Sequence, residues 1–349
     1  MKRNLYAAMS ILAAFAMTGC QGTAAGRPEI AAGRTDNPDT VAVEKLLAYI
    51  RDQNSTGFLV IKDGVTLMSR TWSLAPDPLF DLFRYEVNGE GELLEDVASQ
   101  QKSFVAILVG IAVDKGMVEV GAPVSQYIGT GWSKASPEEE AQIQVGHLLA
   151  MNSGLDDKLE YVAPPGTLFF YNTPAYAVSK QVLTAASGLS LQAMTAAWLT
   201  GPLAMEDTQW RERPAGFGDV GNNGGLVTSP GDSGRFGEMI LARGVAPDGR
   251  RIISETELQK MFAPSATNPA YGRLWWLNGS DHVVRAGAER RDGPLIAAAP
   301  PDLVAALGFL DRRLYVVPSL DLVVVRTGTK VTDENFDEQL WQQLLAILE

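Results

Sequence analysis

Residues 99–116 read SQQKSFVAILVGIAVDKG and hold the strongest structural signal in the chain. The run 103–113 has apolar residues on nearly every side of a helical projection, so it predicts a helix buried in a core. Gly116 is a typical residue for ending such a helix. Ser99 and Lys102 stand at its N-terminal end, and their spacing of three places both side chains on one face.

This pair predicts a serine nucleophile that works without histidine. The positive end of the helix dipole favours the negative charge that develops on an attacking serine oxygen. A lysine beside a buried apolar helix has a lowered pKa, because burial disfavours the ammonium, and it can then act as a base. The alternative is a capped helix whose lysine lies on the surface. The four residues alone leave both interpretations open.

Strand and helix patterns at the two ends of the chain frame this central helix. Four runs have strand character and two have helical spacing: the strands are residues 57–61, 65–68, 313–317 and 320–326, and the helices are residues 41–53 and 333–348. Asp63-Gly64 between the first two strands is a typical hairpin turn. We therefore expect an α+β fold: an antiparallel sheet built from both chain ends, flanked by terminal helices, with a large helical insertion over about residues 100–245. Two independent domains are the alternative, but each half lacks the elements to close its own core.

Composition narrows the classes of function. Of the 349 residues, 46% are hydrophobic, a fraction too high for a disordered chain. The 29 basic and 41 acidic residues give a net charge of −12, which argues against nucleic acid as a partner because phosphate binding needs a basic face. One cysteine and two histidines exclude a disulfide scaffold and a Cys-rich zinc module, and we expect no metal and no other cofactor.

The N-terminus has the pattern of an export signal. A basic start at Lys2 and Arg3 precedes an apolar stretch that is too short to span a membrane, so we expect a signal peptide over residues 1–19. Residues 17–20 (MTGC) resemble a bacterial lipobox, which implies lipidation of Cys20 and membrane attachment through that lipid. The alternative is an ordinary signal peptide followed by a chance cysteine.

The residues after Cys20 agree with a lipid anchor. Residues 20–40 are small and polar and include Pro and Gly, so they predict a flexible tether ahead of one domain over residues 41–349. Gln21, rather than Asp, after the cysteine implies sorting to the outer membrane. We therefore expect an exported, periplasmic bacterial lipoprotein anchored in the outer membrane.

Five short blocks follow one another between residues 41 and 349. They are residues 99–104 (SQQKSF), 145–155 (VGHLLAMNSGL), 165–176 (PGTLFFYNTPAY), 224–236 (GGLVTSPGDSGRF) and 306–308 (ALG). In this order they resemble the motifs of the serine β-lactamase and penicillin-binding-protein superfamily, especially its class C-like branch of esterases, D-amino peptidases and a nylon-oligomer hydrolase. The resemblance implies a β-lactamase/transpeptidase-like fold and a serine hydrolase that cleaves an ester, amide or short peptide.

The resemblance also implies roles for individual residues. Ser99 would attack a carbonyl and form an acyl-enzyme, with Lys102 and Tyr171 as the proton-transfer groups. The backbone N–H groups of Ser99 and Phe309 would form the oxyanion hole. The residues that it places against the substrate are Asn172, Thr173, Ala306, Leu307 and Gly308.

Gly308 and two tryptophans carry expectations of their own. Gly308 has no side chain, which would let a substrate approach the strand backbone. Trp275 and Trp276 are candidates for the mouth of the pocket. Because neighbours in a strand face opposite sides, one tryptophan would face the site and the other the core.

Two positions depart from the superfamily's motifs. The second motif usually reads Tyr-x-Asn, but here Thr173 stands in the Asn position. The third motif has Ala306 where a Lys or His is usual, and in β-lactamases that cation helps to hold the substrate carboxylate. Its loss favours a neutral ester or amide. Arg312 or Arg313 in the following turn either supplies a replacement charge or lies on the surface.

Other functions stay open at this point. A Ser-His-Asp triad with His147 or His282 is possible in principle, but no Gly-x-Ser-x-Gly elbow surrounds Ser99. The changes at Thr173 and Ala306 would also fit a catalytically impaired relative that binds cell-wall fragments or a protein. A transacylase would differ from the hydrolase only in its acceptor.

Overall fold

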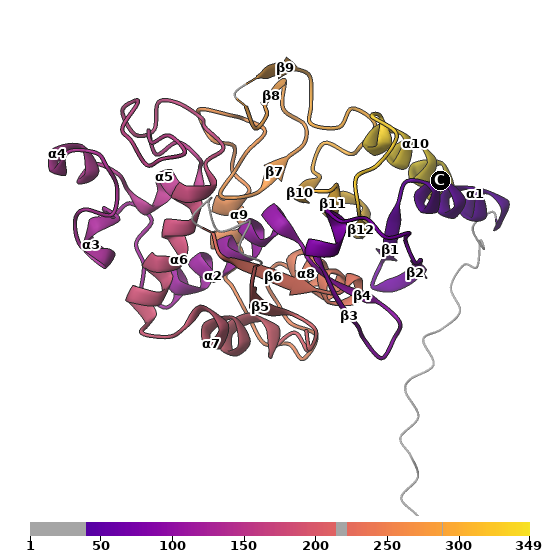
Figure 1. Ribbon diagram of the computed structural model, residues 1–349. Helices are drawn as coiled ribbons and strands as arrows, with labels where there is room; N and C mark the ends of the chain where they lie inside the picture. The colour runs from indigo at the N-terminus through magenta and orange to yellow at the C-terminus, as the bar shows by residue number, and fades with distance from the viewer. Residues whose placement is uncertain (1–39, 214–221, 288) are drawn as a thin grey trace, which may run out of the picture. The chain divides into compact units, whose positions relative to one another are not determined.

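The computed structural model describes residues 40–213, 222–287 and 289–349, and Figure 1 shows the course of the chain. The predicted signal peptide over residues 1–19, the lipidation site at Cys20 and the tether up to residue 39 lie outside the described residues. Within the described part, no single helix is long and apolar enough to cross a membrane. One bent pair, Thr173–Ser187 with Leu191–Thr200, reaches that length and apolarity only when its two helices are taken together.

Both chain ends contribute to one six-stranded antiparallel sheet, as the sequence predicts. Its order is β2-β1-β12-β11-β10-β7. The strands are β1 (Ser55–Lys62), β2 (Val65–Thr71), β7 (Trp276–Leu277), β10 (Val304–Gly308), β11 (Arg312–Val317) and β12 (Leu322–Gly328). The early strand β1 pairs directly with the last strand, β12. The hairpin turn at Asp63 and Gly64 has φ values of 53° and 71°, as a two-residue turn of this kind requires.

Helices cover the two faces of this sheet. The terminal helices α1 (Thr40–Asp52) and α10 (Phe336–Leu348) lie side by side (Figure 1). Trp341 of α10 packs edge-on against Tyr315 of β11. The neighbouring Leu314 lies against α8 (Pro230–Leu241), where a Cβ on Gly237 would come within 3.4 Å of it. Neighbours in a strand face opposite sides, so α10 and α8 cover opposite faces.

The middle of the chain is mostly helical, but it also contains strands that the sequence pattern missed. Its helices are α2 (Gln101–Asp114), α3 (Ser125–Ile128), α4 (Pro137–Glu140), α5 (Val145–Leu149), α6 (Thr173–Ser187), α7 (Leu191–Thr195), the π-helix η3 (Ala196–Thr200) and α8, and α9 (Glu255–Met261) follows. The strands β5 (Gln209–Glu212) and β6 (Gly224–Thr228) join β3 (Arg84–Val87) and β4 (Leu93–Asp96) in a second antiparallel sheet of order β3-β4-β6-β5. β5 and β6 are short and begin with polar residues or glycines, so neither has a clear alternating pattern. A separate pair, β8 (His282–Val284) and β9 (Arg290–Asp292), completes the strands described here.

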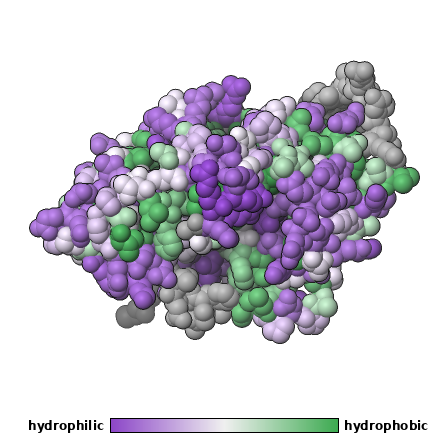
Figure 2. Space-filling model, turned by 90° about the horizontal axis from the view of Figure 1, so that it is seen from above, coloured by the Kyte–Doolittle hydropathy of each residue, from purple (hydrophilic) through white to green (hydrophobic). Residues whose placement is uncertain are grey.

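Helix α2 lies in the main hydrophobic core of the described residues. Its residues from Gln101 to Ala112 are all buried, as the apolar run predicts, and Gly116 after its end has a φ of 70°. Phe104 of α2 stacks on Phe236 of α8 with ring centroids 3.8 Å apart. In contrast, the face of the molecule in Figure 2 is mostly polar, and its apolar residues form separate patches. The fold therefore holds Ser99 and Lys102 at the end of a helix that cannot move without disturbing the core.

Candidate active site

Ser99 lies in a tight turn that leads directly into α2. The turn is the 3-10 helix η2 (Ala98–Gln100). Ala98 has a φ of 51°, a left-handed conformation that is strained for a residue with a side chain. The Asp96 carboxylate accepts a hydrogen bond of 2.8 Å from the Ala98 N–H and so supports this conformation. Strained residues that are held in this way are common at active sites.

Lys102 is buried beside Ser99, which excludes a surface position for this lysine. Only 2% of the residue is exposed, and its Nζ donates a hydrogen bond of 3.0 Å to Ser99 Oγ. Nζ also lies 4.9 Å from the ring centre of Tyr171 and 4.8 Å from that of Tyr176. Burial, with repulsion from Arg213 and Lys180, lowers the pKa of Lys102 to about 7. The amine can therefore lose its proton near neutral pH.

Tyr171 is held beside this pair by other aromatic rings. It stacks on Trp276 with centroids 5.9 Å apart and meets Tyr271 edge-on at 6.2 Å. Burial raises the pKa of Tyr171 to about 12, although a hydrogen bond with Ser99 opposes this shift. Tyr171 is therefore a neutral phenol at physiological pH, and Lys102 is the stronger candidate for the base.

Ser99 opens into a cavity of about 260 Å³. The residues that line it are Phe83, Ala98, Ser99, Gln101, Lys102, Thr173, Arg213, Asn222 and Phe309. Phe309 is 54% exposed and its ring lies 5.9 Å from that of Phe83. The structure thus brings the predicted residues Ser99, Lys102, Thr173 and Phe309 to one cavity with a partly aromatic wall, which we call the Ser99 cleft.

Asn172 does not face the Ser99 cleft, so its predicted contact with substrate is wrong. Its side-chain amide donates hydrogen bonds to the carbonyl oxygens of Leu155 and Asp156, at 2.8 and 2.7 Å. Its Oδ1 accepts a hydrogen bond of 2.9 Å from the Ala175 N–H, at the start of α6. All of the polar atoms of this buried side chain are used in capping the helix and fixing a loop.

The predicted contacts at Ala306, Leu307 and Gly308 also lie outside the lining of the Ser99 cleft. Ala306 is 1% exposed and belongs to the core. A Cβ at Gly308 would lie 2.3 Å from the carbonyl oxygen of Val97. Glycine is therefore needed for β10 to pack against the chain just before Ser99, whatever the path of a substrate.

The two tryptophans are both buried, and neither lines the Ser99 cleft. Trp276 stacks on Tyr171. Trp275 has no exposed surface and packs against Phe236 and Phe262. Neither tryptophan therefore lies at the mouth of the Ser99 cleft as predicted: Trp275 is a core residue, and Trp276 is buried against Tyr171.

Neither histidine lies in the Ser99 cleft. His147 accepts a hydrogen bond of 3.0 Å at Nδ1 from the Gln144 N–H at the start of α5. His282 lies in β8 with its Nδ1 2.6 Å from the carboxylate of Asp281. Because neither residue lines the cleft, a triad with Ser99 has no support in the described residues.

Sequence reasoning missed the cations around the Ser99 cleft. Arg213 donates to Asp96 at 2.6 and 3.0 Å and to the carbonyl oxygen of Asn222 at 3.1 Å. Lys180 binds the side-chain oxygen of the same Asn222, and burial lowers its pKa to about 8. In the structure Gly225 makes room for the ion pair, since a Cβ there would lie 2.0 Å from the Asp96 carboxylate; in the sequence it is only a glycine of the fourth block.

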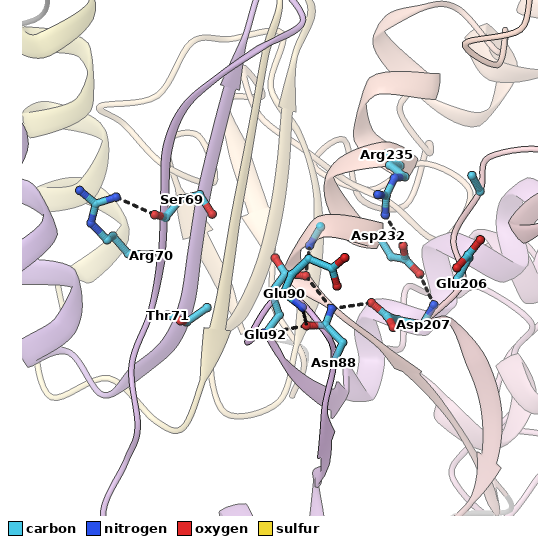
Figure 3. Close-up of a pocket in the computed structure, with 12 residues that line it drawn as sticks. Ser69, Arg70, Thr71, Asn88, Glu90, Glu92, Glu206, Asp207, Asp232 and Arg235 are labelled. Carbon is cyan, nitrogen blue, oxygen red and sulfur yellow. Dashed lines mark hydrogen bonds and ion pairs between the residues drawn. The ribbon is translucent and has the colours of Figure 1, made fainter.

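A larger cavity of about 550 Å³ shares no lining residue with the Ser99 cleft (Figure 3). It is rich in carboxylates, including Asp232 from the fourth sequence block. Asp232 accepts hydrogen bonds from the Asp207 N–H at 2.9 Å and from Thr208 Oγ1 at 2.7 Å, and it pairs with Arg235 at 2.6 Å. Burial raises its pKa to about 6. In the described part of the chain, no group of three or more His, Cys, Asp and Glu side chains is placed to hold a metal ion.

The fold and the sequence together define the family. The Beta-lactamase family model matches residues 52–348, and the chain belongs to this family of hydrolases. Solved structures agree on the fold. A beta-lactamase from Mycobacterium bovis has a TM-score of 0.63 at 17% identity, over 87% of this chain and 98% of that one. The beta-lactamase/D-alanine carboxypeptidase of Yersinia pestis has a TM-score of 0.60 at 16% identity, over 88% and 98%.

One relative is named after a substrate that differs from those in the names of the two solved structures above. The 6-aminohexanoate-dimer hydrolase of Paenarthrobacter ureafaciens is 22% identical over 284 residues. The match covers 66% of this chain and 65% of the relative, so this chain spans about two thirds of the relative's length.

The burial of Lys102 should lower the stability of the fold. Replacing this lysine with an apolar residue should restore that stability. Because the folded-state pKa lies below the ordinary value of 10.5, the unfolded chain binds the proton more tightly. We expect Lys102→Met to raise the Tm at pH 7 by about 2 °C or more, measured by differential scanning calorimetry. The gain should shrink as the pH rises from about 7 towards 10.5, since the wild type regains stability in that window.

The exposed Lys158 supplies a matched control. Lys158→Met should change the free energy of unfolding by no more than about 0.5 kcal/mol at any of these pH values. A Lys102→Met protein less stable than the wild type at pH 7 would show that the buried ammonium is stabilised in a way that this geometry does not contain.

Proposed function

We propose that the protein is a serine hydrolase that cleaves an ester or amide through an acyl-enzyme on Ser99. The observation that carries the proposal is the hydrogen bond of 3.0 Å between Ser99 Oγ and a buried lysine whose pKa is about 7. A serine becomes a nucleophile when an adjacent base can take its proton. The family of hydrolases to which the chain belongs, and its relative named a 6-aminohexanoate-dimer hydrolase, support this reaction class.

In the first half-reaction, neutral Lys102 takes the proton from Ser99 Oγ while Oγ bonds to the substrate carbonyl carbon. The carbonyl oxygen becomes an oxyanion, to which the N–H groups of Ser99 and Phe309 donate hydrogen bonds; both residues line the Ser99 cleft. The tetrahedral intermediate then collapses, and the proton passes from Lys102, with Tyr171 as the relay, to the departing alcohol or amine. Water attacks the acyl-enzyme in the same way and releases the acid.

The Ser99 cleft favours a neutral acyl group. Its arginine, Arg213, already donates three hydrogen bonds, two of them to Asp96, so its charge is balanced before a substrate enters. Phe309 and Phe83 contribute aromatic surface to the wall. A carboxylate brought into this cleft would lose hydration and would compete with Asp96 for Arg213, and this costs free energy.

The first test is covalent labelling of Ser99. A fluorophosphonate probe should label the wild type at Ser99, as peptide mass spectrometry would show, and Ser99→Ala should abolish the label. Ser103 is a matched control, because its Oγ is buried and donates to the carbonyl oxygen of Leu274. Ser103→Ala should keep the label. A folded wild type that is not labelled would favour the idle relative that binds cell-wall fragments or a protein.

The pH dependence identifies the base. We expect kcat/KM for p-nitrophenyl butyrate to rise with pH and level off above an apparent pKa of about 7, because only neutral Lys102 can accept the proton. Lys102→Met should lower kcat/KM by about 10²–10⁴-fold and remove this limb.

Histidine is the other group that titrates near this pH, so two variants separate it from the lysine. His147→Asn and His282→Gln should both retain the limb, since neither residue lines the Ser99 cleft. Loss of the limb in either histidine variant would contradict Lys102 as the base.

Substrate charge is tested with two esters that have acyl groups of four carbons. The kcat/KM for p-nitrophenyl butyrate should exceed that for the p-nitrophenyl monoester of succinate by about tenfold or more, because an unpaired carboxylate in the cleft costs at least about 1.4 kcal/mol. Equal rates, or faster cleavage of the succinate ester, would show that a cation is available to the substrate.

A further inference from the structure

Two buried arginines bind the turn that carries Phe309. The turn spans residues 309–311 between β10 and β11. Arg312 Nη1 donates a hydrogen bond of 2.9 Å to the carbonyl oxygen of Phe309. Arg326 Nη1 donates to the carbonyl oxygens of Leu310 and Asp311, each at 3.0 Å. All three carbonyls of the turn are therefore held by guanidinium groups, and both arginines have no exposed surface.

This turn needs external support. Leu310 and Asp311 have φ values of 60° and 58°, and neither is glycine. Two consecutive left-handed residues with side chains are strained, so the conformation persists only where the surroundings hold it. Hydrogen bonds from a charged donor are among the strongest that a protein can supply to a carbonyl oxygen.

Glu95 in turn fixes Arg312. Its carboxylate lies 2.9 Å from Arg312 Nη2, and both side chains are fully buried. The same carboxylate accepts a hydrogen bond from the Gly328 N–H at 3.2 Å, which ties it to β12. The guanidinium of Arg312 also lies 4.9 Å from the ring centre of Phe83, a wall of the Ser99 cleft.

Glu95 stands next to Asp96, and this links the two sides of the site. Asp96 holds the N–H of Ala98 in the turn before Ser99, while Glu95 holds the arginine of the Phe309 turn. The next residue, Val97, packs on Gly308, which directly precedes Phe309 and where no Cβ would fit. One short stretch of β4 thus sets the position of Ser99 and that of Phe309 relative to each other.

We propose that Arg312 and Arg326 are positioning residues that hold the Phe309 N–H in place for the oxyanion, with Glu95 orienting Arg312. This proposal rests on the proposed hydrolase function, since it concerns the same site. It assigns to Arg312 neither a surface position nor a charge for the substrate, because its side chain is buried and faces a backbone carbonyl and a carboxylate.

The test removes the ion pair without leaving a buried charge unpaired. In the double variant Glu95→Gln/Arg312→Gln, both charges are lost and amides of similar size remain. We expect kcat for p-nitrophenyl butyrate to fall by about 10²-fold, as when one oxyanion donor is lost, with KM within about threefold of the wild type. Affinity for butylboronic acid, whose tetrahedral adduct on serine places an oxygen in the oxyanion hole, should fall in the same proportion as kcat.

Two further variants keep the test decisive. Arg312→Lys keeps a positive charge beside Glu95 but loses the planar fork, so it should lower kcat and boronate affinity by a smaller factor, and it serves as the test if the double variant does not fold. Arg251 binds the carbonyl oxygens of Arg243 and Ile253 through one guanidinium nitrogen, and it does not line the Ser99 cleft. Arg251→Gln should leave kcat and boronate affinity unchanged.

The outcomes separate this proposal from the proposed function. A wild type that hydrolyses the ester and is labelled at Ser99, while the folded variants keep kcat and boronate affinity within threefold, overturns the positioning role alone. A fall in kcat with unchanged boronate affinity also overturns it, because the loss would then lie outside the oxyanion hole. A wild type that shows neither hydrolysis nor labelling overturns both proposals.

Discussion

The site depends on the contact between Lys102 and Ser99, made where no carboxylate of the described residues pairs with the lysine. Helix α2 is apolar on all sides, so the fold must bury it, and its burial carries Lys102 into the core. The rings of Tyr171 and Tyr176 attract the ammonium less strongly than an ion pair would. The low pKa of Lys102 is thus a direct consequence of how the core is built, and the fold loses stability to obtain it.

Acidic side chains do lie near the site, but each of them forms an ion pair with an arginine. Asp96 pairs with Arg213 and Glu95 pairs with Arg312. A carboxylate free to approach Lys102 would raise the lysine's pKa and protonate the base. With the carboxylates engaged, the charges that shift the pKa of Lys102 are those of Arg213 and Lys180, and their repulsion lowers it further. The ion pairs therefore serve the base indirectly, by keeping acidic groups away from it.

Local sequence patterns predict the parts of this protein that local physics decides. The burial of α2 and the contact between Ser99 and Lys102 follow from helical periodicity. The partners of Asp96 and Glu95 do not, because 117 residues separate Asp96 from Arg213 and no spacing rule connects them. The prediction for Asn172 failed for a related reason: Asn172 lies next to the motif's Asn position, which suggested that its amide reaches the substrate, but the helix that begins beside it uses its oxygen as a cap.

The contacts of Asp96 and Arg213 bear on the absence of a cation at position 306. In the motif, one Lys or His on the strand supplies charge where the substrate binds, whereas here Ala306 is in the core and the positive charge comes from Arg213. An anionic substrate that bound the edge of Arg213 now paired with Asp96 would displace that carboxylate. Asp96 also holds the N–H of the strained residue Ala98, so displacement would loosen the turn that presents Ser99. Under the proposed mechanism, the preference for neutral substrates and the position of the nucleophile thus depend on the same carboxylate.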